Sequence, residues 1–351
     1  MDLWDAIITG AGLAGVCTAL ELRARGANVL LLDSGQPGRE ASSAAAGMLA
    51  PADPETPVLL RAFAAAAALF YPEFVEKLEQ SSGCKVDFRR QGTIVLGEES
   101  PPPEYRRLPP PELHRLEPEL KADAYEVFFV AEDSVDPVLL IRAALRAAEL
   151  AGVEVRAACA VRRMRWLGSH VEVLTDNGVL QAEAAVNCMG AWSGPPVKPR
   201  KGQMLYLKAP RPGLLQHAVR APGAYMVPRS SGKILVGTTV EDVGFDKSVD
   251  AAVIRKMHQA AADYLPELES APLIESWAGL RPGSPDNLPV IGSTAERNVF
   301  IASGLFRNGI LLAPYTGRIV AEMVMGKNLE LDISAFSPSR FAQNANPLVT
   351  R

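Results

Sequence analysis

A glycine-rich turn near the start of the sequence has the residue types and spacing that bind a dinucleotide. Gly10, Gly12 and Gly15 follow a short apolar run and open a stretch with helical periodicity, and a second apolar run over 28–32 ends at Asp33. Gly10 permits the tight turn, Gly12 lets backbone N–H groups approach a pyrophosphate, and Gly15 lets the helix pack close to the strand. The free N–H groups at the helix N-terminus favour phosphate there.

Asp33 narrows the choice of dinucleotide. Its carboxylate can accept hydrogen bonds from the ribose hydroxyls of adenosine, and its charge would repel a 2′-phosphate. The pattern therefore favours NAD or FAD over NADP, but it does not separate NAD from FAD. The alternative is a glycine-rich turn that binds nothing, which the strand before it and the helix after it disfavour.

Residues that carry metal or nucleophilic catalysis are scarce and scattered. The sequence has four cysteines and four histidines and contains no CxxC, HExxH or GxSxG motif, so no metal site is expected. The cysteines are Cys17, Cys84, Cys159 and Cys188, and the histidines are His114, His170, His217 and His258. We expect free thiols in a reducing compartment, and a catalyst of this composition would take its chemistry from a cofactor.

Composition excludes several other classes of protein. The 351 residues are 48% apolar and 22% charged, and the net charge of −4 does not indicate a nucleic-acid binder. The longest run without a polar residue, 62–71, is shorter than the roughly 20 residues of a spanning helix, so no membrane segment is expected. The first five residues are acidic rather than basic, which does not indicate a secretory signal, and a cytoplasmic protein is expected.

The order of predicted elements indicates α/β and α+β parts. A βαβ unit comes first, mixed pieces follow, and an α/β pattern returns near the C-terminus. Helices are predicted over 58–80, 137–151, 251–264 and 308–325, a buried strand over 184–188, and alternating strands over 204–207, 224–227 and 233–238. We therefore predict a Rossmann-type domain built from several segments, with an antiparallel-sheet substrate domain inserted.

Seven further segments resemble a known family. They are Ser42–Pro51 (SSAAAGMLAP), Val135–Pro137, Gly190–Gly194, Tyr225–Arg229 with Lys233–Gly237, Trp277–Gly283 (WAGLRPG) and Gly304–Pro314 (GLFRNGILLAP). Together they resemble FAD-dependent glycine oxidases of the D-amino-acid oxidase/sarcosine oxidase family, over residues 5 to 340. The AAAGML loop narrows the resemblance to the glycine oxidases.

This resemblance implies a set of site residues. FAD would be held by Gly10, Gly12, Leu13, Ala14, Gly15, Asp33, Ser34, Ser42, Ala46, Gly47, Met48, Val161, Leu305, Phe306, Arg307, Asn308, Gly309, Ile310 and Leu311. The substrate carboxylate would be held by Arg281, assisted by Tyr225 and Arg307. No cysteine lies in 304–314, where sarcosine oxidases attach their flavin, so the FAD is expected to be non-covalent.

The resemblance also implies an activity and a domain division. Members oxidise glycine, sarcosine or small D-amino acids to the imino acid with O₂ reduced to H₂O₂, and the glycine enzymes supply the imine for the thiazole ring of thiamine. The FAD-binding domain would comprise 1–84, 134–202 and 277–342, the substrate-binding domain 85–133 and 203–276, and the tail 343–351. The alternatives are a D-amino-acid dehydrogenase, a sarcosine-type oxidase, or a flavin-binding subunit without turnover. A homo-oligomer is left open.

The residue types suit this chemistry. A guanidinium such as that of Arg281 is planar, permanently charged and able to donate two parallel hydrogen bonds to a carboxylate. We expect Arg281 on a rigid turn over 279–283; the alternative is a structural ion pair. Tyr225 is expected to donate its hydroxyl, the alternative being a core ring. Arg307 would line the pocket or brace its loop, and the helix from about Asn308 would offset negative charge on the flavin.

Overall fold

The N-terminal strand–helix–strand unit forms as predicted. In the computed structural model, which describes residues 3–344, β1 (Leu3–Thr9) pairs in parallel with β2 (Val29–Leu32), and α1 (Leu13–Ala24) connects them. All four residues of β2 are buried, which explains their unbroken apolar run, because a parallel strand is covered on both faces.

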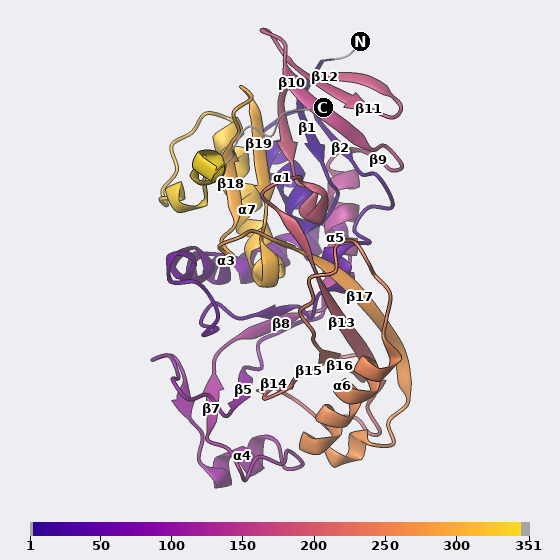
Figure 1. Cartoon of the computed structure of the whole chain (residues 1–351), viewed down its shortest axis with the longest axis vertical. Helices are drawn as coiled ribbons and strands as arrows, with labels where there is room; N and C mark the ends of the chain where they lie inside the picture. The colour runs from indigo at the N-terminus through magenta and orange to yellow at the C-terminus, as the bar shows by residue number, and fades with distance from the viewer. Residues whose placement is uncertain (1–2, 345–351) are drawn as a thin grey trace.

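Two distant stretches of the chain, 154–187 and 290–303, add strands to this unit and complete the first large sheet (Figure 1). Its order is β10-β11-β12-β1-β2-β9, with β19 paired to β12 and β18 paired to β19. The added strands are β9 (Glu154–Arg156), β10 (Val161–Trp166), β11 (Val171–Thr175), β12 (Gly178–Asn187), β18 (Val290–Ser293) and β19 (Val299–Ser303). The pairs β2–β1, β1–β12 and β12–β19 are parallel, as a dinucleotide-binding sheet requires.

Helices cover one face of this sheet. On the other face, side chains from the sheet's own antiparallel strands pack against its parallel strands. The helices are α1, α3 (Val58–Ser82), α5 (Pro137–Leu150) and α7 (Gly309–Val324), whose buried side chains form one core cluster. Helices α1 and α7 touch so closely that a Cβ on Gly317 would lie 2.7 Å from the Cβ of Cys17. On the opposite face, side chains of β10 and β11 pack against Trp4 and Ile7 of β1.

Helix α3 is one continuous helix that passes through Pro72. It is the one helix within residues 3–344 whose length and composition would suffice to cross a membrane. Core helices of soluble proteins meet the same criteria, and here Leu60, Phe63 and Tyr71 are buried in the core, while Leu69 is 84% exposed. The predicted lack of a membrane segment therefore stays a prediction.

The second large sheet is antiparallel except where β5 pairs with β14, and its order is β17-β13-β16-β15-β14-β5-β7-β6. The strands are β5 (Thr93–Leu96), β6 (Arg106–Arg107), β7 (Val127–Val130), β13 (Lys198–Lys208), β14 (Ala218–Ala221), β15 (Ala224–Pro228), β16 (Lys233–Gly237) and β17 (Leu273–Gly283). Alternate residues face opposite sides. Leu205 and Leu207 pack with α4 (Pro110–Leu116) and α6 (Ala251–Tyr264), whereas Met204 and Tyr206 face away from them.

A small third sheet joins these two regions. It contains β3 (Met48–Leu49), β8 (Asp133–Val135) and β4 (Phe88–Arg89), in the order β3-β8-β4. A short helix, α2 (Ala41–Ala44), precedes β3. The segment that carries α2 and β3 therefore lies where the two large sheets meet.

The fold class is as predicted, and one local expectation is wrong. Arg281 lies inside the long strand β17, paired in register with Arg200 of β13, and not on a turn. The proline and glycines around it are accommodated because β17 is an edge strand of its sheet. The domain division stays a prediction; β13 and β17 run without interruption through its boundaries at 202 and 277.

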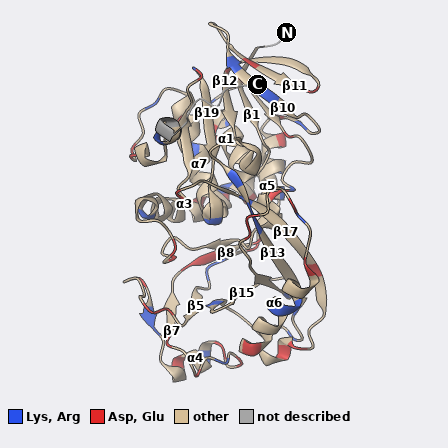
Figure 2. Cartoon of the chain, in the orientation of Figure 1, with Lys and Arg blue, Asp and Glu red and all other residues tan. Residues whose placement is uncertain are grey.

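Two smaller expectations concern the chain end and the surface. Of the predicted tail 343–351, residues 343 and 344 belong to the 3₁₀ segment Pro338–Asn344, and the others lie outside the described residues. Acidic and basic residues are interspersed over both sheets and their helices (Figure 2). This mixture agrees with the small net charge of the sequence.

Candidate active site

One cavity of about 510 Å³ runs from the glycine-rich turn to the antiparallel sheet. It is lined by nearly every residue that the sequence suggested for a flavin and its substrate, although they come from segments more than 290 residues apart. From the predicted set these are Gly10, Gly12, Leu13, Ala14, Asp33, Ser34, Ser42, Ala46, Gly47, Met48, Val161, Tyr225, Arg281, Leu305, Phe306, Arg307, Asn308, Gly309 and Ile310.

Two predicted cofactor residues do not line the cavity. A Cβ on Gly15 would clash with the carbonyl oxygen of Gly10, so Gly15 lets the helix approach the turn. This is the packing role expected of the third glycine. Leu311 is 1% exposed and belongs to the core beneath α7.

The nucleotide end of the cavity is formed mainly by backbone. Gly10 has a φ of +94°, and a Cβ there would clash with the carbonyl of Cys188. The two oxygens of Asp33 accept from the N–H of Ala11 and of Gly35, each at 2.8 Å. Asp33 therefore braces the turn and keeps lone pairs for a ribose hydroxyl.

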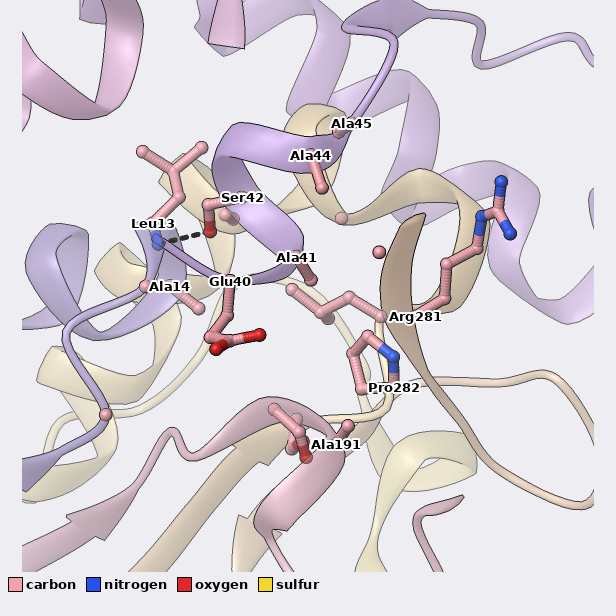
Figure 3. A pocket seen from close by; sticks show the side chains of 18 of the residues that line it. Leu13, Ala14, Glu40, Ala41, Ser42, Ala44, Ala45, Ala191, Arg281 and Pro282 are labelled. Carbon is pink, nitrogen blue, oxygen red and sulfur yellow. Dashed lines mark hydrogen bonds between the residues drawn. The ribbon is translucent and has the colours of Figure 1, made fainter. Parts of the chain in front are cut away.

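The N-terminus of α1 also opens into this end. No side chain of its N-cap residue Gly12 caps it, and its first turn has no acidic residue. The Ser42 hydroxyl accepts from the N–H of Leu13 at 2.9 Å (Figure 3). The remaining N–H groups of the first turn and the dipole of the helix suit a pyrophosphate, so these residues fit the nucleotide half of FAD.

The middle of the cavity is bordered by the loop between α2 and β3, which the antiparallel sheet holds from outside. The indole N–H of Trp277 donates to the carbonyl of Ala44 at 3.0 Å. A Cβ on Gly279 would lie 2.6 Å from the Cβ of Ala44, so β17 is in direct contact with the end of α2, from which the loop starts. Gly47 has a φ of +75°, and a Cβ there would clash with the carbonyl of Val135.

Arg281 enters the other end of the cavity from β17. Its Nη1 donates to the carbonyl of Thr239 at 3.1 Å and its Nη2 to the hydroxyl of Thr238 at 2.8 Å. The guanidinium lies over Gly202 of the neighbouring strand, where any Cβ would clash with it. Within residues 3–344 no carboxylate lies within 4 Å of it, so the ion-pair alternative is not what this geometry shows. Figure 3 shows Arg281 on the opposite side of the cavity from Leu13 and Ser42.

Tyr225 reaches the same place from β15. Its ring lies over Gly237 of β16, where a Cβ would be 2.5 Å from the phenol oxygen, and its hydroxyl lies 3.7 Å from the sulfur of Met204. Burial raises the pKa of the Tyr225 phenol, while the positive charge of Arg281 opposes the rise. The hydroxyl is therefore protonated at neutral pH and available as a donor beside the guanidinium.

Arg307 lies at the rim of the cavity. It precedes α7, and its guanidinium pairs with Glu55, on the loop that follows β3. Both side chains are largely exposed, at 39% and 65%. Next to it, the N-terminus of α7 has no side-chain cap and no acidic residue in its first turn, and Gly309 and Ile310 line the cavity.

The sequence did not single out several lining residues. Met204 and Thr238 border the Arg281–Tyr225 end, and Cys159 and Cys188 lie farther along the wall. The alternation of β13 could have placed Met204 on the cavity side, but no sequence pattern marks Thr238. Burial raises the pKa of Cys188 to about 12, so this thiol is protonated and a poor nucleophile. The part of the chain that is described contains no cluster suited to a metal ion.

Behind the cavity, a buried charge cluster ties the rim loop to the antiparallel sheet. Arg220 of β14 donates to Asp53 at 2.8 Å and to the hydroxyl of Tyr105 at 2.7 Å, and it lies 3.0 Å from Glu132. Burial raises the pKa of the Glu132 carboxyl to about 7, against the opposing charge of Arg220. Asp53 itself lines the cavity, so this cluster helps to position the loop that also contains Glu55.

Comparisons with known proteins agree with this geometry. The DAO family, described as FAD dependent oxidoreductase, matches residues 5–323. The bifunctional protein ThiO/ThiG of Trichormus variabilis is 34% identical over 365 residues, which cover 97% of this chain and 56% of that protein. The chain therefore spans about half the length of this relative.

Two further comparisons cover both partners almost completely. Glycine oxidase of Geobacillus kaustophilus is 33% identical over 366 residues, 96% of this chain and 97% of that protein. The crystal structure of glycine oxidase from the same organism matches with a TM-score of 0.90 at 31% identity, and covers 96% of this chain and 98% of that one.

Proposed function

This chain belongs to the DAO family of FAD-dependent oxidoreductases, and on that premise we propose that it oxidises glycine and similarly small amines to the imino acid, with O₂ reduced to H₂O₂. FAD is the cofactor of the family, and when bound it accepts the two electrons that leave the substrate and passes them to O₂. The observation that carries the proposal is the convergence of Arg281 and Tyr225 at the end of a cavity suited to FAD.

The residues around Arg281 support the binding of a carboxylate. Thr238 and Thr239 hold the guanidinium from behind, and no acidic side chain of the described residues pairs with it. A bound carboxylate would supply that partner through two parallel hydrogen bonds, and the Tyr225 hydroxyl would add a third. We assign Arg307 to the entrance, where its guanidinium pairs with Glu55 and braces the loop that follows β3.

The same end of the cavity favours small substrates. Met48, Met204 and the Tyr225 ring belong to one apolar cluster at the antiparallel sheet. No histidine lines the cavity among the described residues, which supports a reaction that begins from the neutral amine, whose lone pair assists removal of hydride from Cα. The protein then contributes mainly position and charge.

The proposed biological role of this protein rests on relatives that are longer than this chain and contain a second region. Because ThiO/ThiG joins a region like this chain to a second region, we propose that the imine made here serves thiazole formation for thiamine. We place the protein in the cytoplasm; its four free cysteines, three of them buried, are consistent with a reducing compartment.

Spectroscopy of the purified protein tests the proposal directly. Yellow protein should be bleached by glycine or sarcosine without air, and air should restore the colour with one H₂O₂ formed per imine. Acid precipitation should leave the flavin in the supernatant, because no cysteine lies in 304–314, where sarcosine oxidases attach their flavin. Bleaching only by bulky D-amino acids would contradict a preference for glycine. No recovery in air would indicate a related dehydrogenase instead of an oxidase.

A further inference from the structure

Arg229, at the turn after β15, is buried without a close ionic partner. Its side chain is 1% exposed, and the nearest carboxylate oxygen, on Asp136, is 4.0 Å from its Nε. Asp136 already caps α5 by accepting from the N–H groups of Val138 and Leu139. A charge removed from water in this way is costly unless its hydrogen bonds are made, so the contacts of Arg229 indicate why it is there.

Those contacts join two main-chain segments beside the cavity. Nη2 donates to the carbonyl of Ala46 at 2.5 Å, and Nη1 donates to the carbonyl of Val135 at 3.0 Å. Nε lies 3.4 Å from the hydroxyl of Tyr206. Ala46 belongs to the loop that borders the cavity, and Val135 ends β8, so one guanidinium holds the loop against the small sheet.

The bond to Ala46 determines where the next N–H points. In a trans peptide the C=O and the N–H point in opposite directions. Since the Ala46 carbonyl faces Arg229, the N–H of Gly47 faces the other way. Gly47 is buried and lines the cavity, and no hydrogen bond within residues 3–344 uses its N–H, although its carbonyl accepts from Val135 at 2.9 Å.

A buried N–H without a partner costs about 1–3 kcal/mol, which favours a ligand that supplies an acceptor. We propose that Arg229 is a positioning residue. Its guanidinium holds the Ala46–Gly47 peptide so that the Gly47 N–H donates to a polar atom on the flavin ring. The inference depends on the FAD of the family but not on the identity of the amine, so it can fail while the proposed activity stands.

The test compares Arg229 with Arg89, a matched control in β4. Arg89 also donates to two carbonyls of this region, those of Pro228 at 2.9 Å and Gln216 at 3.1 Å, but it does not contact the loop. Arg229→Gln in the apoprotein should weaken FAD binding by tenfold or more, as measured by quenching of flavin fluorescence. Arg89→Gln should change the dissociation constant by less than twofold.

Two readouts separate positioning from general stability. In the wild type, hydrogen exchange of a peptide covering residues 41–50 should slow when FAD binds, and in Arg229→Gln this protection should be lost. The midpoint potential of the bound flavin should fall, since a donor and a nearby positive charge no longer favour the reduced form. Arg89→Gln should show neither change even if its melting temperature is lower.

If Arg229→Gln does not fold, the same measurements are made on Arg229→Lys. It keeps the charge and most of the aliphatic chain, but a single ammonium lacks the planar fork that spans two carbonyls. We expect intermediate FAD affinity and partial protection of 41–50. FAD affinity of Arg229→Gln within threefold of wild type, wild-type affinity and full protection of 41–50 in Arg229→Lys, or an equal loss in Arg89→Gln, would overturn the inference.

Discussion

The two ends of the cavity recognise their ligands by different means. At the glycine-rich turn, the groups presented are backbone N–H groups of consecutive residues, with Asp33 bracing the turn. At the antiparallel sheet, they are the side chains of Tyr225 and Arg281, which come from separate strands and each lie over a glycine of the neighbouring strand. The first end is a local motif, whereas the second exists only once the sheet has formed.

This difference predicts that the two ends can be damaged independently. Changes at the sheet should act on the kinetics of the substrate and leave the cofactor bound, and changes at the turn should do the reverse.

Arg281→Ala should impair binding of the substrate and leave binding of FAD unchanged. Loss of a charged, partly buried partner typically costs about 2–5 kcal/mol, or roughly 30- to several-thousand-fold in kcat/KM for glycine. Much of the loss should appear in KM, because the carboxylate is held in both ground and transition states. Steady-state H₂O₂ production, with FAD content confirmed by absorbance, measures it, and Arg281→Lys should fall between.

Arg200→Ala is the control for this substitution. Arg200 is the register partner of Arg281, but its guanidinium pairs with Asp242 near the surface. Such pairs contribute up to about 1 kcal/mol, so kcat/KM should change little. A kcat/KM for Arg281→Ala within threefold of wild type would remove Arg281 from the substrate end.

Gly202→Ala should damage the same end without removing any functional group. The new methyl would occupy space that the Arg281 guanidinium now fills, so the flexible end of that side chain would have to move. A displacement of about 1 Å in a group that positions the substrate can cost roughly 100-fold in rate. We expect roughly 10- to 100-fold lower kcat/KM for glycine with FAD affinity near that of wild type. The role given to Gly202 would be contradicted if the variant had wild-type kinetics and its crystal structure showed Arg281 in an unchanged position.

Asp33→Asn should damage the nucleotide end alone. The amide can still accept from one N–H of the turn, but it loses the charge and one of two acceptor atoms. Because each such charged hydrogen bond contributes about 1.5–3 kcal/mol, FAD affinity should fall roughly 10- to 100-fold. At saturating FAD, KM for glycine should be unchanged, and a parallel rise in KM would refute the separation of the two ends.

Glu132→Gln should change the pH dependence of stability. The folded-state pKa of Glu132 is raised from 4.5 to about 7, so between these values the folded state binds more protons than the unfolded state. The free energy of unfolding should therefore fall as pH rises through this window, by about 1–3 kcal/mol. Thermal unfolding at pH 5 and pH 7.5 should show that slope in the wild type and a flatter one in the variant.

The same contrast explains what could be predicted from sequence. The βαβ unit, its glycines and Asp33 are contiguous, so their spacing alone predicts the local geometry. The resemblance identified Arg281 and Tyr225, but it could not show that Arg281 lies within a strand or that Gly202 makes room for it. The sequence did not identify Met204, Thr238 and Arg229 as site residues, because their positions depend on strand pairing between segments far apart in the chain.

The contact between α1 and α7, where Gly317 meets Cys17, has a consequence for synthesis on the ribosome. Within this chain, α1 (Leu13–Ala24) is translated long before α7 (Gly309–Val324). A nascent chain that lacks α7 leaves the apolar side of α1 uncovered and one wall of the cavity missing. The cavity therefore becomes complete only after α7 has been synthesised, and until then the apolar face of α1 is exposed surface of the kind that chaperones bind.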